Sequence, residues 1–217
     1  MHLSSAFPHA FAGDVEHVMA VTPDATMSSN GLFQVEVRGE SLTIPTRIYN
    51  DVPSTESIRA LTVTQQTILH CLYTRHHDGR VRQRHLEQVT GSNEPWVAPF
   101  VVQLAGEYVV EILEAISRTL PDLTVPHSAQ RRIYGDFIAR NLAFFARTQR
   151  RVASYWSCYY RWKYPWFATY PGSPLMEAFR AAASEQSGRV TPRHTPPACS
   201  CGTVCPSNLN EVFQRGS

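Results

Sequence analysis

The hydrophobic pattern of the chain is strongest in the stretch Pro99–Leu120, PFVVQLAGEYVVEILEAISRTL. Its polar residues recur every three or four positions, which draws one narrow stripe along a helix. Nearly all the other positions are apolar, and a helix that is apolar around most of its circumference is buried. The sequence therefore predicts one central core helix with an acidic seam. The glutamates of this seam are Glu107, Glu111 and Glu114.

A second pattern, alternation with a period of two, lies nearer the N-terminus. Leu32–Val37 and Ser41–Ile48 are rich in β-branched residues, and Gly39 between them supplies the positive φ of a tight turn. Pro45 cannot donate a hydrogen bond to a neighbouring strand, so the second strand is expected at an edge. The pattern predicts a β-hairpin, which must pack on helices to be stable.

Helical periodicity dominates the rest of the chain. We expect a break at Asn141, because an unbroken helix from Ser128 to Tyr164 would be unusually long. The predicted fold class is therefore mainly α, a helical bundle of about five or six helices around a central buried helix (Pro99–Leu120), with an N-terminal β-hairpin. Besides the central helix, the expected helices are Thr64–Arg75, Arg80–Val89, Ser128–Arg140, Asn141 to about Pro165, and Pro174–Ser184.

The same patterns divide the chain into three parts. An N-terminal segment without clear periodicity is expected to be disordered or weakly ordered, and so is a C-terminal tail that contains Pro, Ser and Cys. Between them we expect a single globular domain. Met27 is an alternative start, which leaves open whether Met1–Thr26 belongs to the mature protein. The three parts are residues 1–30, residues 31–186 (hairpin 31–49, helices 64–184) and residues 187–217.

Charge is distributed unevenly along the 217 residues. The net charge is only +2, but residues 128–164 carry seven Arg and one Lys against Asp136 alone. An acidic seam that faces a basic helix inside one domain satisfies both without a ligand. We therefore expect the three glutamates to form a structural ion-pair seam with Arg147, Arg150 and Arg151. Lys163 is the only lysine beside nineteen arginines, a skew that favours genome composition over selection for phosphate binding.

A basic loop is the first candidate binding site. Several donors that converge near a helix N-terminus could hold a phosphate, although the loop lacks the glycine spacing of a P-loop, and a solvated turn between helices has the same composition. Its candidate binding residues are Arg75, His76, His77, Arg80 and Arg84.

An aromatic-rich helix is the second candidate. Basic and aromatic residues interleave where single-stranded nucleic acids are bound, but also where a helix buries large rings and keeps its cations in solvent. Aromatic residues point in nearly every direction around this helix, so some must be exposed or meet another chain. The candidate binding residues here are Trp156, Tyr160, Arg161 and Lys163.

Two further readings remain open. Arg82–Val89, the turn Thr90–Asn93 and the residues from Glu94 onward have the spacing of a helix-turn-helix, yet Pro95 and Pro99 would interrupt its second helix. An enzyme or metal protein could use His76, His77 or His85 with Glu107 or Glu111, but no nucleophile elbow, Walker loop or dinucleotide fingerprint occurs. The tail cysteines match a zinc pattern poorly, so no metal and no cofactor are predicted. These cysteines are Cys199, Cys201 and Cys205.

The sequence thus favours a non-catalytic interaction or oligomerisation protein that uses its aromatic-rich helix. The alternative is a nucleic-acid-binding, helix-turn-helix-like protein that uses the basic 75–84 loop and the 147–163 helix; enzyme chemistry is the third reading. A protein partner or self-association is expected, nucleic acid is possible, and no membrane partner is expected because glutamates interrupt the longest apolar stretch. We expect a cytoplasmic protein, since no basic leader precedes Arg38.

Overall fold

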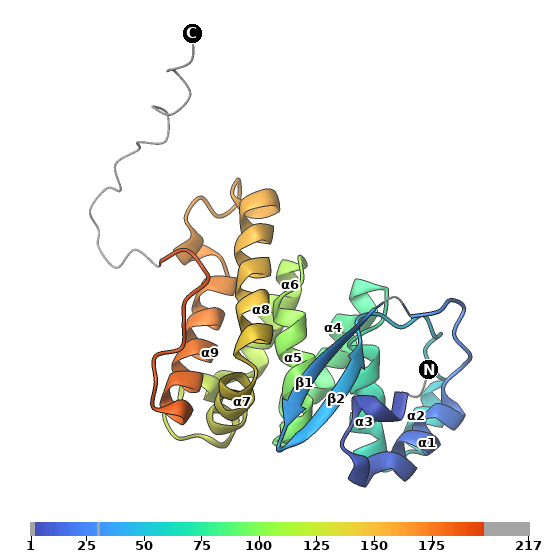
Figure 1. Cartoon of the computed structure of the whole chain (residues 1–217). Helices are drawn as coiled ribbons and strands as arrows, with labels where there is room; N and C mark the ends of the chain where they lie inside the picture. Colours follow the sequence, from blue (N-terminus) through green and yellow to red (C-terminus); the bar gives the residue numbers. More distant parts are fainter. Residues whose placement is uncertain (1–2, 30, 198–217) are drawn as a thin grey trace.

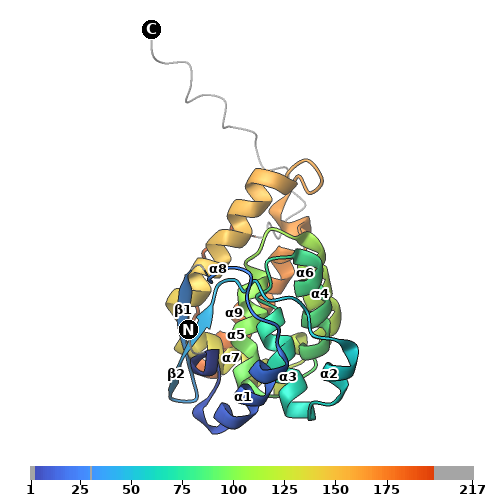
Figure 2. The same ribbon diagram turned by 90° about the vertical axis from the view of Figure 1, so that its right-hand side faces the viewer.

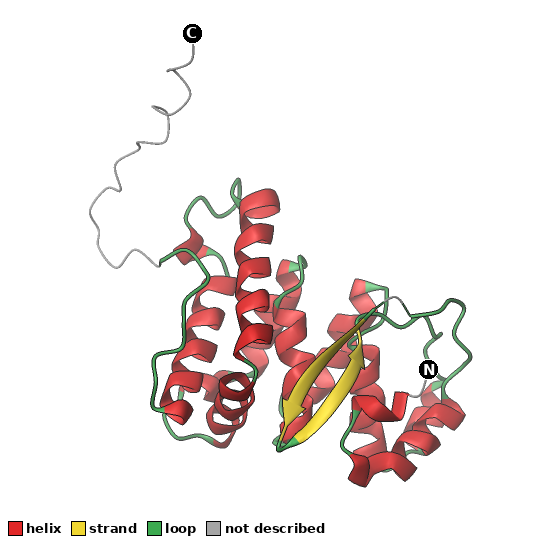
Figure 3. Ribbon diagram, in the orientation of Figure 1, coloured by secondary structure: helices red, strands yellow, loops and turns green. Residues whose placement is uncertain are grey.

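The computed structural model describes residues 3–29 and 31–197, and within them the fold is mainly helical with one two-stranded antiparallel sheet (Figures 1 and 3). The helices and strands are α1 (Ala12–Val21), β1 (Leu32–Val37), β2 (Glu40–Pro45), α2 (Thr55–Arg59), α3 (Val63–Tyr73), α4 (Gly79–Val89), α5 (Ala98–Ala105), α6 (Val110–Thr119), α7 (Ala129–Arg140), α8 (Leu142–Tyr155) and α9 (Gly172–Ser187). Short turns of helix are η1 (Leu3–Ala6), η2 (His9–Phe11), η3 (Pro95–Val97), η4 (Pro121–Thr124), η5 (Trp156–Tyr160) and η6 (Phe167–Thr169). The predicted bundle with an N-terminal hairpin is confirmed.

The helices form two groups around α5 and α6. Figure 1 shows α7, α8 and α9 on one side of this central pair and α1 to α4 on the other. The view in Figure 2 is turned by 90° and shows α8 projecting beyond the other helices at one end of the molecule. The predicted break is confirmed, since α7 ends and α8 begins around Asn141.

The hairpin of β1 and β2 lies in front of the central helices in the view of Figure 1. Val35 pairs with Leu42 across the two strands, and both side chains are buried. Gly39 has a φ of +89°, which a residue with a side chain rarely adopts, so the glycine is required at this turn. The Asn141 side chain accepts a hydrogen bond from the backbone N–H of Glu36 and donates one to its carbonyl. One asparagine thereby ends α7 and binds the edge of β1.

The central helix differs from its prediction, because Pro99–Leu120 forms two helices. Gly106 ends α5, and α6 begins only at Val110. All eight residues of α5 are buried, as the apolar pattern predicts. The apolar pattern continues past Ala105, but the helix ends there and the chain turns at Gly106. A Cβ at Gly106 would lie 3.2 Å from the Thr148 Cγ2 atom, so α8 packs closely against the turn. A polar stripe of regular spacing does not reveal such a turn.

The N-terminal segment also differs from its prediction. Residues 3–29 pack on the domain instead of staying loosely attached: α1 buries Val15 and Val18, and the Phe7 ring stacks on Phe100 with centroids 5.4 Å apart. The weak periodicity of this segment gives no helix prediction, yet several of its apolar residues are buried and α1 packs against α3. In the predicted tail, residues 187–197 are described and Ser187 still belongs to α9, whereas residues 198–217, with Cys199, Cys201 and Cys205, lie outside the described residues, as do Met1 and His2.

The closest helix packing, between α7 and α9, gives a test of the fold. A Cβ at Gly135 would lie 2.4 Å from the backbone carbonyl oxygen of Ala182, so Gly135→Ala must push the two helices apart. We expect the free energy of unfolding to fall by about 2–3 kcal/mol, measured by urea denaturation.

Gly13→Ala is the matched control, because Gly13 lies in α1 with nothing within 4 Å of a Cβ. This substitution should be neutral or stabilising by up to about 1 kcal/mol. A Gly135→Ala protein as stable as the original chain would contradict the packing of α7 on α9.

Candidate functional site

A buried charge cluster lies at the break between α5 and α6. The Glu107 carboxylate is 2.8 Å from Arg47 Nη1, 2.6 Å from Arg75 Nη2 and 2.9 Å from Arg82 Nε. Glu107, Arg75 and Arg82 are buried, whereas Arg47 is partly exposed. We call these four residues the Glu107 cluster. It joins the segment after β2, the end of α3, the first turn of α4 and the central break.

The cluster sets the ionisation of its members. Burial alone would raise the pKa of Glu107, but the three guanidinium groups outweigh burial and hold that pKa below its ordinary value. Burial lowers the pKa of Arg75 to about 10, against the opposing effect of Glu107. Glu107 is therefore ionised at neutral pH, and as an anion bound by three cations it is unsuited to act as a general base.

The predicted ion-pair seam is not what the structure contains. Glu107 turns inward to the Glu107 cluster, while Glu111 and Glu114 are exposed on α6. Among the described residues, none of the three lies within 4 Å of a charged nitrogen of Arg147, Arg150 or Arg151. The reason is the break after Ala105, which places Glu107 outside the helix that carries the other two glutamates.

The basic loop is divided between structural and exposed residues. Arg75 belongs to the Glu107 cluster, and buried His76 is bonded through Nε2 to the Asn50 carbonyl oxygen at 3.1 Å. His77 stacks on Tyr49, and Arg80 and Arg84 face solvent. The residues of the predicted phosphate site therefore do not converge, and the role of the exposed ones in binding stays a prediction.

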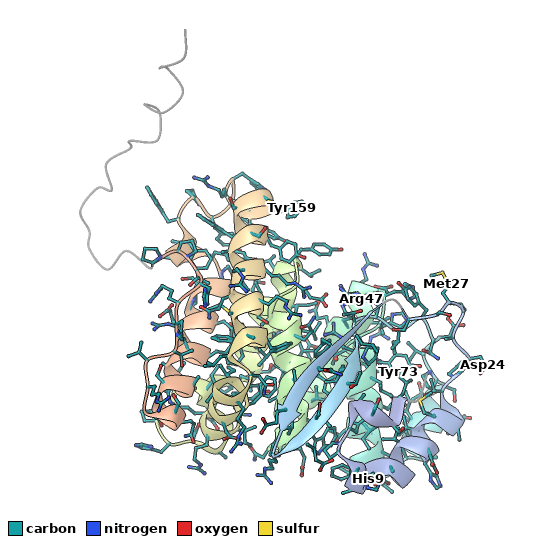
Figure 4. All side chains as sticks on the ribbon, viewed as in Figure 1. His9, Asp24, Met27, Arg47, Tyr73 and Tyr159 are labelled. Atoms are coloured by element: carbon teal, nitrogen blue, oxygen red, sulfur yellow. The ribbon has the colours of Figure 1, made fainter. Side chains whose placement is uncertain are left out.

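Buried His85 forms a pair with His70, which is only partly buried. Its Nδ1 atom is 2.8 Å from Nδ1 of His70, and its ring stacks on Tyr73, which Figure 4 labels. The described residues contain no group of three or more His, Cys, Asp or Glu side chains that could hold a metal ion. The structure thus does not bring the histidines together with Glu107 or Glu111, as the enzyme reading requires.

The aromatic helix ends in an exposed cluster, which we call the aromatic tip. Its members are Tyr108 (54% exposed), Tyr159 (60%), Trp162 (82%) and Trp166 (63%). Tyr159 lies at the end of α8 that projects from the molecule (Figure 4). The Trp162 indole N–H donates to the Tyr159 carbonyl, and the Tyr108 and Tyr159 rings both lie 6.2 Å from the Tyr155 ring. Exposed apolar patches often mark interaction sites.

Two candidate residues of the sequence support the tip from inside. The Tyr160 hydroxyl donates to the Tyr108 carbonyl at 2.6 Å and accepts from the Val110 N–H at 3.3 Å. The Trp156 indole N–H donates to the Tyr164 carbonyl at 2.8 Å. Both rings are only partly exposed, so they position the tip and do not form its surface. The sequence places Tyr159, Trp162 and Trp166 in the aromatic cluster of this helix, but it does not select them as binding residues, and it does not indicate Tyr108 at all.

The missed residues have a physical explanation. The last turn of the aromatic helix, η5, is a π-helical turn, so its side chains no longer follow the 3.6-residue period of α8. The alternation of buried and exposed faces that α8 predicts therefore changes beyond Tyr155. Only the interleaving of aromatic and basic residues signals the tip in the sequence.

Cations lie along α8 and in the region of the aromatic tip, where Tyr164 and, more weakly, Glu114 and Glu111 raise the pKa of Lys163. Residues 137–176 contain no Asp or Glu. Among the described residues, Arg147, Arg150 and Arg151 lie within 4 Å of no carboxylate. Arg161 lies over the Trp156 ring at 5.4 Å, and Lys163 lies over the Tyr164 ring at 5.2 Å. The arginines elsewhere that do pair with carboxylates are Arg47, Arg75, Arg82, Arg118, Arg131, Arg140, Arg180 and Arg193.

The helix-turn-helix reading is wrong. After α4 the chain forms the short turn η3 and then α5, and every residue of α5 is buried. A recognition helix must present side chains to the major groove, so α5 cannot serve as one.

The chain was compared with known families, curated proteins and solved structures. A scan of family models, a search of curated proteins and a search of solved structures each found no match. Across residues 3–29 and 31–197, no helix has both the length and the apolar character that a membrane span requires.

The histidine pair gives a pH test. Burial, with help from the neighbouring His70, lowers the pKa of His85 to about 3, and burial also lowers the pKa of His70. As pH falls below about 6.5, His70 and His85 become protonated in the unfolded chain but stay neutral in the folded chain. The free energy of unfolding therefore decreases. We expect the free energy of unfolding to drop by on the order of 2 kcal/mol from pH 6.5 to pH 5.

His85→Gln should flatten this dependence, whereas His17→Gln, at an exposed position, should not change it. Urea denaturation at several pH values measures both. An original chain equally stable at the two pH values would contradict the neutral histidine pair.

Proposed function

We propose that the protein is a non-catalytic interaction module and that the aromatic tip is its binding surface. The observation that carries the proposal is the exposure of Tyr108, Tyr159, Trp162 and Trp166 at and around the end of the aromatic helix. Removing such rings from water on binding would contribute much of the affinity. Tyr160 and Trp156 hold the tip in place through backbone hydrogen bonds, which limits the entropy lost on binding.

The charge around the tip selects the partner. Arg147, Arg150 and Arg151 lie on the helix that leads to the tip, and Arg161 and Lys163 lie within the tip region. Two copies that met through this surface would bring like charges together, which disfavours self-association. The chemistry fits an anionic partner, whose charge would replace the carboxylates that these arginines lack.

The proposal is tested by the binding of heparin, a polyanion without bases. Heparin should change the tryptophan fluorescence of the original chain, and Arg147→Gln with Arg150→Gln should weaken its binding several-fold. Arg59→Gln with Arg189→Gln is the matched control, because these arginines are exposed and form no ion pair among the described residues.

Sedimentation velocity completes the test. We expect a monomer at all concentrations examined. A dimer that Trp162→Ser with Trp166→Ser abolishes would make a second copy the partner, and a chain that binds no polyanion would overturn the proposal.

A further inference from the structure

We infer that the anionic partner is a single-stranded nucleic acid that lies along α8 and ends with its bases on the aromatic tip. This inference rests on the proposed function and deepens it, since it names the partner of the same surface. Three observations carry it: the line of cations on α8, their lack of carboxylate partners, and the orientation of the exposed rings.

The cations of α8 form a track. Arg147 and Arg150 are exposed on α8, Ser154 continues their face at helical spacing, and Ser157 and Arg161 are exposed in and just after the π-helical turn that follows. Along α8 the track runs about 12 Å from Arg147 to Tyr155 at 1.5 Å per residue, and it continues through the π-helical turn to Arg161. A surface of that length fits an extended, charged chain better than a compact anion.

Within the described part of the chain, the arginines of this track are not paired with carboxylates, so their charge is available to a bound anion. Eight described arginines elsewhere are paired with Asp or Glu, whereas Arg147, Arg150 and Arg151 have no such partner within 4 Å. A phosphate that approaches these guanidinium groups displaces no existing ion pair. Each such contact releases counterions and makes the affinity depend on salt.

The exposed rings supply the second half of the interaction. The Trp162 indole N–H donates to the Tyr159 carbonyl at 2.9 Å, which orients the ring while 82% of the residue stays exposed. Trp166 and Tyr159 present further open rings in the same region. Unpaired bases stack on such rings irrespective of sequence.

Other anionic partners use only part of this surface. An acidic peptide has carboxylates for the arginines but no series of planar rings for the tip. A bilayer entered by Trp162 and Trp166 would leave Arg147, which lies about 12 Å from the end of α8 at Tyr155, farther from the lipid than the Debye length of about 8 Å at physiological salt. A duplex offers phosphates but keeps its bases stacked inside. A single strand uses both features.

The test is fluorescence anisotropy with labelled oligothymidine of about twenty nucleotides, a length that covers the site sizes of sequence-independent binders. Affinity should fall steeply with salt. Arg147→Gln with Arg150→Gln should reduce the slope of log affinity against log salt by about 1.4, and the control Arg59→Gln with Arg189→Gln should leave the slope unchanged.

Trp162→Ser with Trp166→Ser should weaken binding at least about tenfold and barely change the salt slope, because stacking releases no counterions. All three variants change exposed side chains, and equal melting temperatures would show that each is folded. An abasic strand and a duplex of the same length should both bind more weakly than oligothymidine. Oligouridine in parallel tells whether RNA or DNA is preferred.

Failure of the inference differs from failure of the proposed function. Oligothymidine that binds no tighter than the abasic strand or heparin overturns the inference, while the tip remains an anion-binding surface. Tighter binding to vesicles containing phosphatidylserine, lost in Trp162→Ser with Trp166→Ser, overturns it in favour of a lipid surface. Absence of binding to every anion overturns both.

Discussion

The interaction on which the rest of this structure depends is the pairing of the Glu107 carboxylate with Arg47, Arg75 and Arg82. The two buried cations, Arg75 and Arg82, need an anion beside them, and a carboxylate is buried at acceptable cost only when it is paired. The Glu107 cluster meets both conditions by drawing Glu107 out of the helical path. The central helix then has to break, and α5 and α6 become separate elements.

The break also positions the aromatic tip. Tyr108 follows Glu107 directly and points outward, while its carbonyl accepts the Tyr160 hydroxyl proton at 2.6 Å. Val110 donates its N–H to the same hydroxyl oxygen, so the start of α6 is fastened to the end of the aromatic helix. The turn between α5 and α6 therefore carries both the buried Glu107 carboxylate and the exposed Tyr108 ring. This link explains why the exposed aromatic tip lies next to the buried Glu107 cluster.

The sequence predicts the regular parts of this fold and fails where tertiary contacts override local pattern. The hairpin and the break at Asn141 follow from alternation and helix length. The break at Gly106 does not, because the polar stripe continues through it and only the distant arginines favour it. For the candidate site, composition locates the aromatic helix, but the π-helical turn at Trp156–Tyr160 decides which rings face solvent. The partners of Glu107 are far apart in sequence, so spacing alone could not find them.

Hydrogen–deuterium exchange on Glu107→Gln, beside the exposed control Glu111→Gln, tests this account most directly. Loss of the carboxylate charge leaves three arginines unpaired, so exchange should accelerate at residues 108–110 and 156–166 together, while the α7–α9 pair keeps its protection. Glu111→Gln should leave all these segments unchanged. Unchanged exchange at both segments in Glu107→Gln, or acceleration at only one of them, would contradict the claim that the Glu107 cluster positions the aromatic tip.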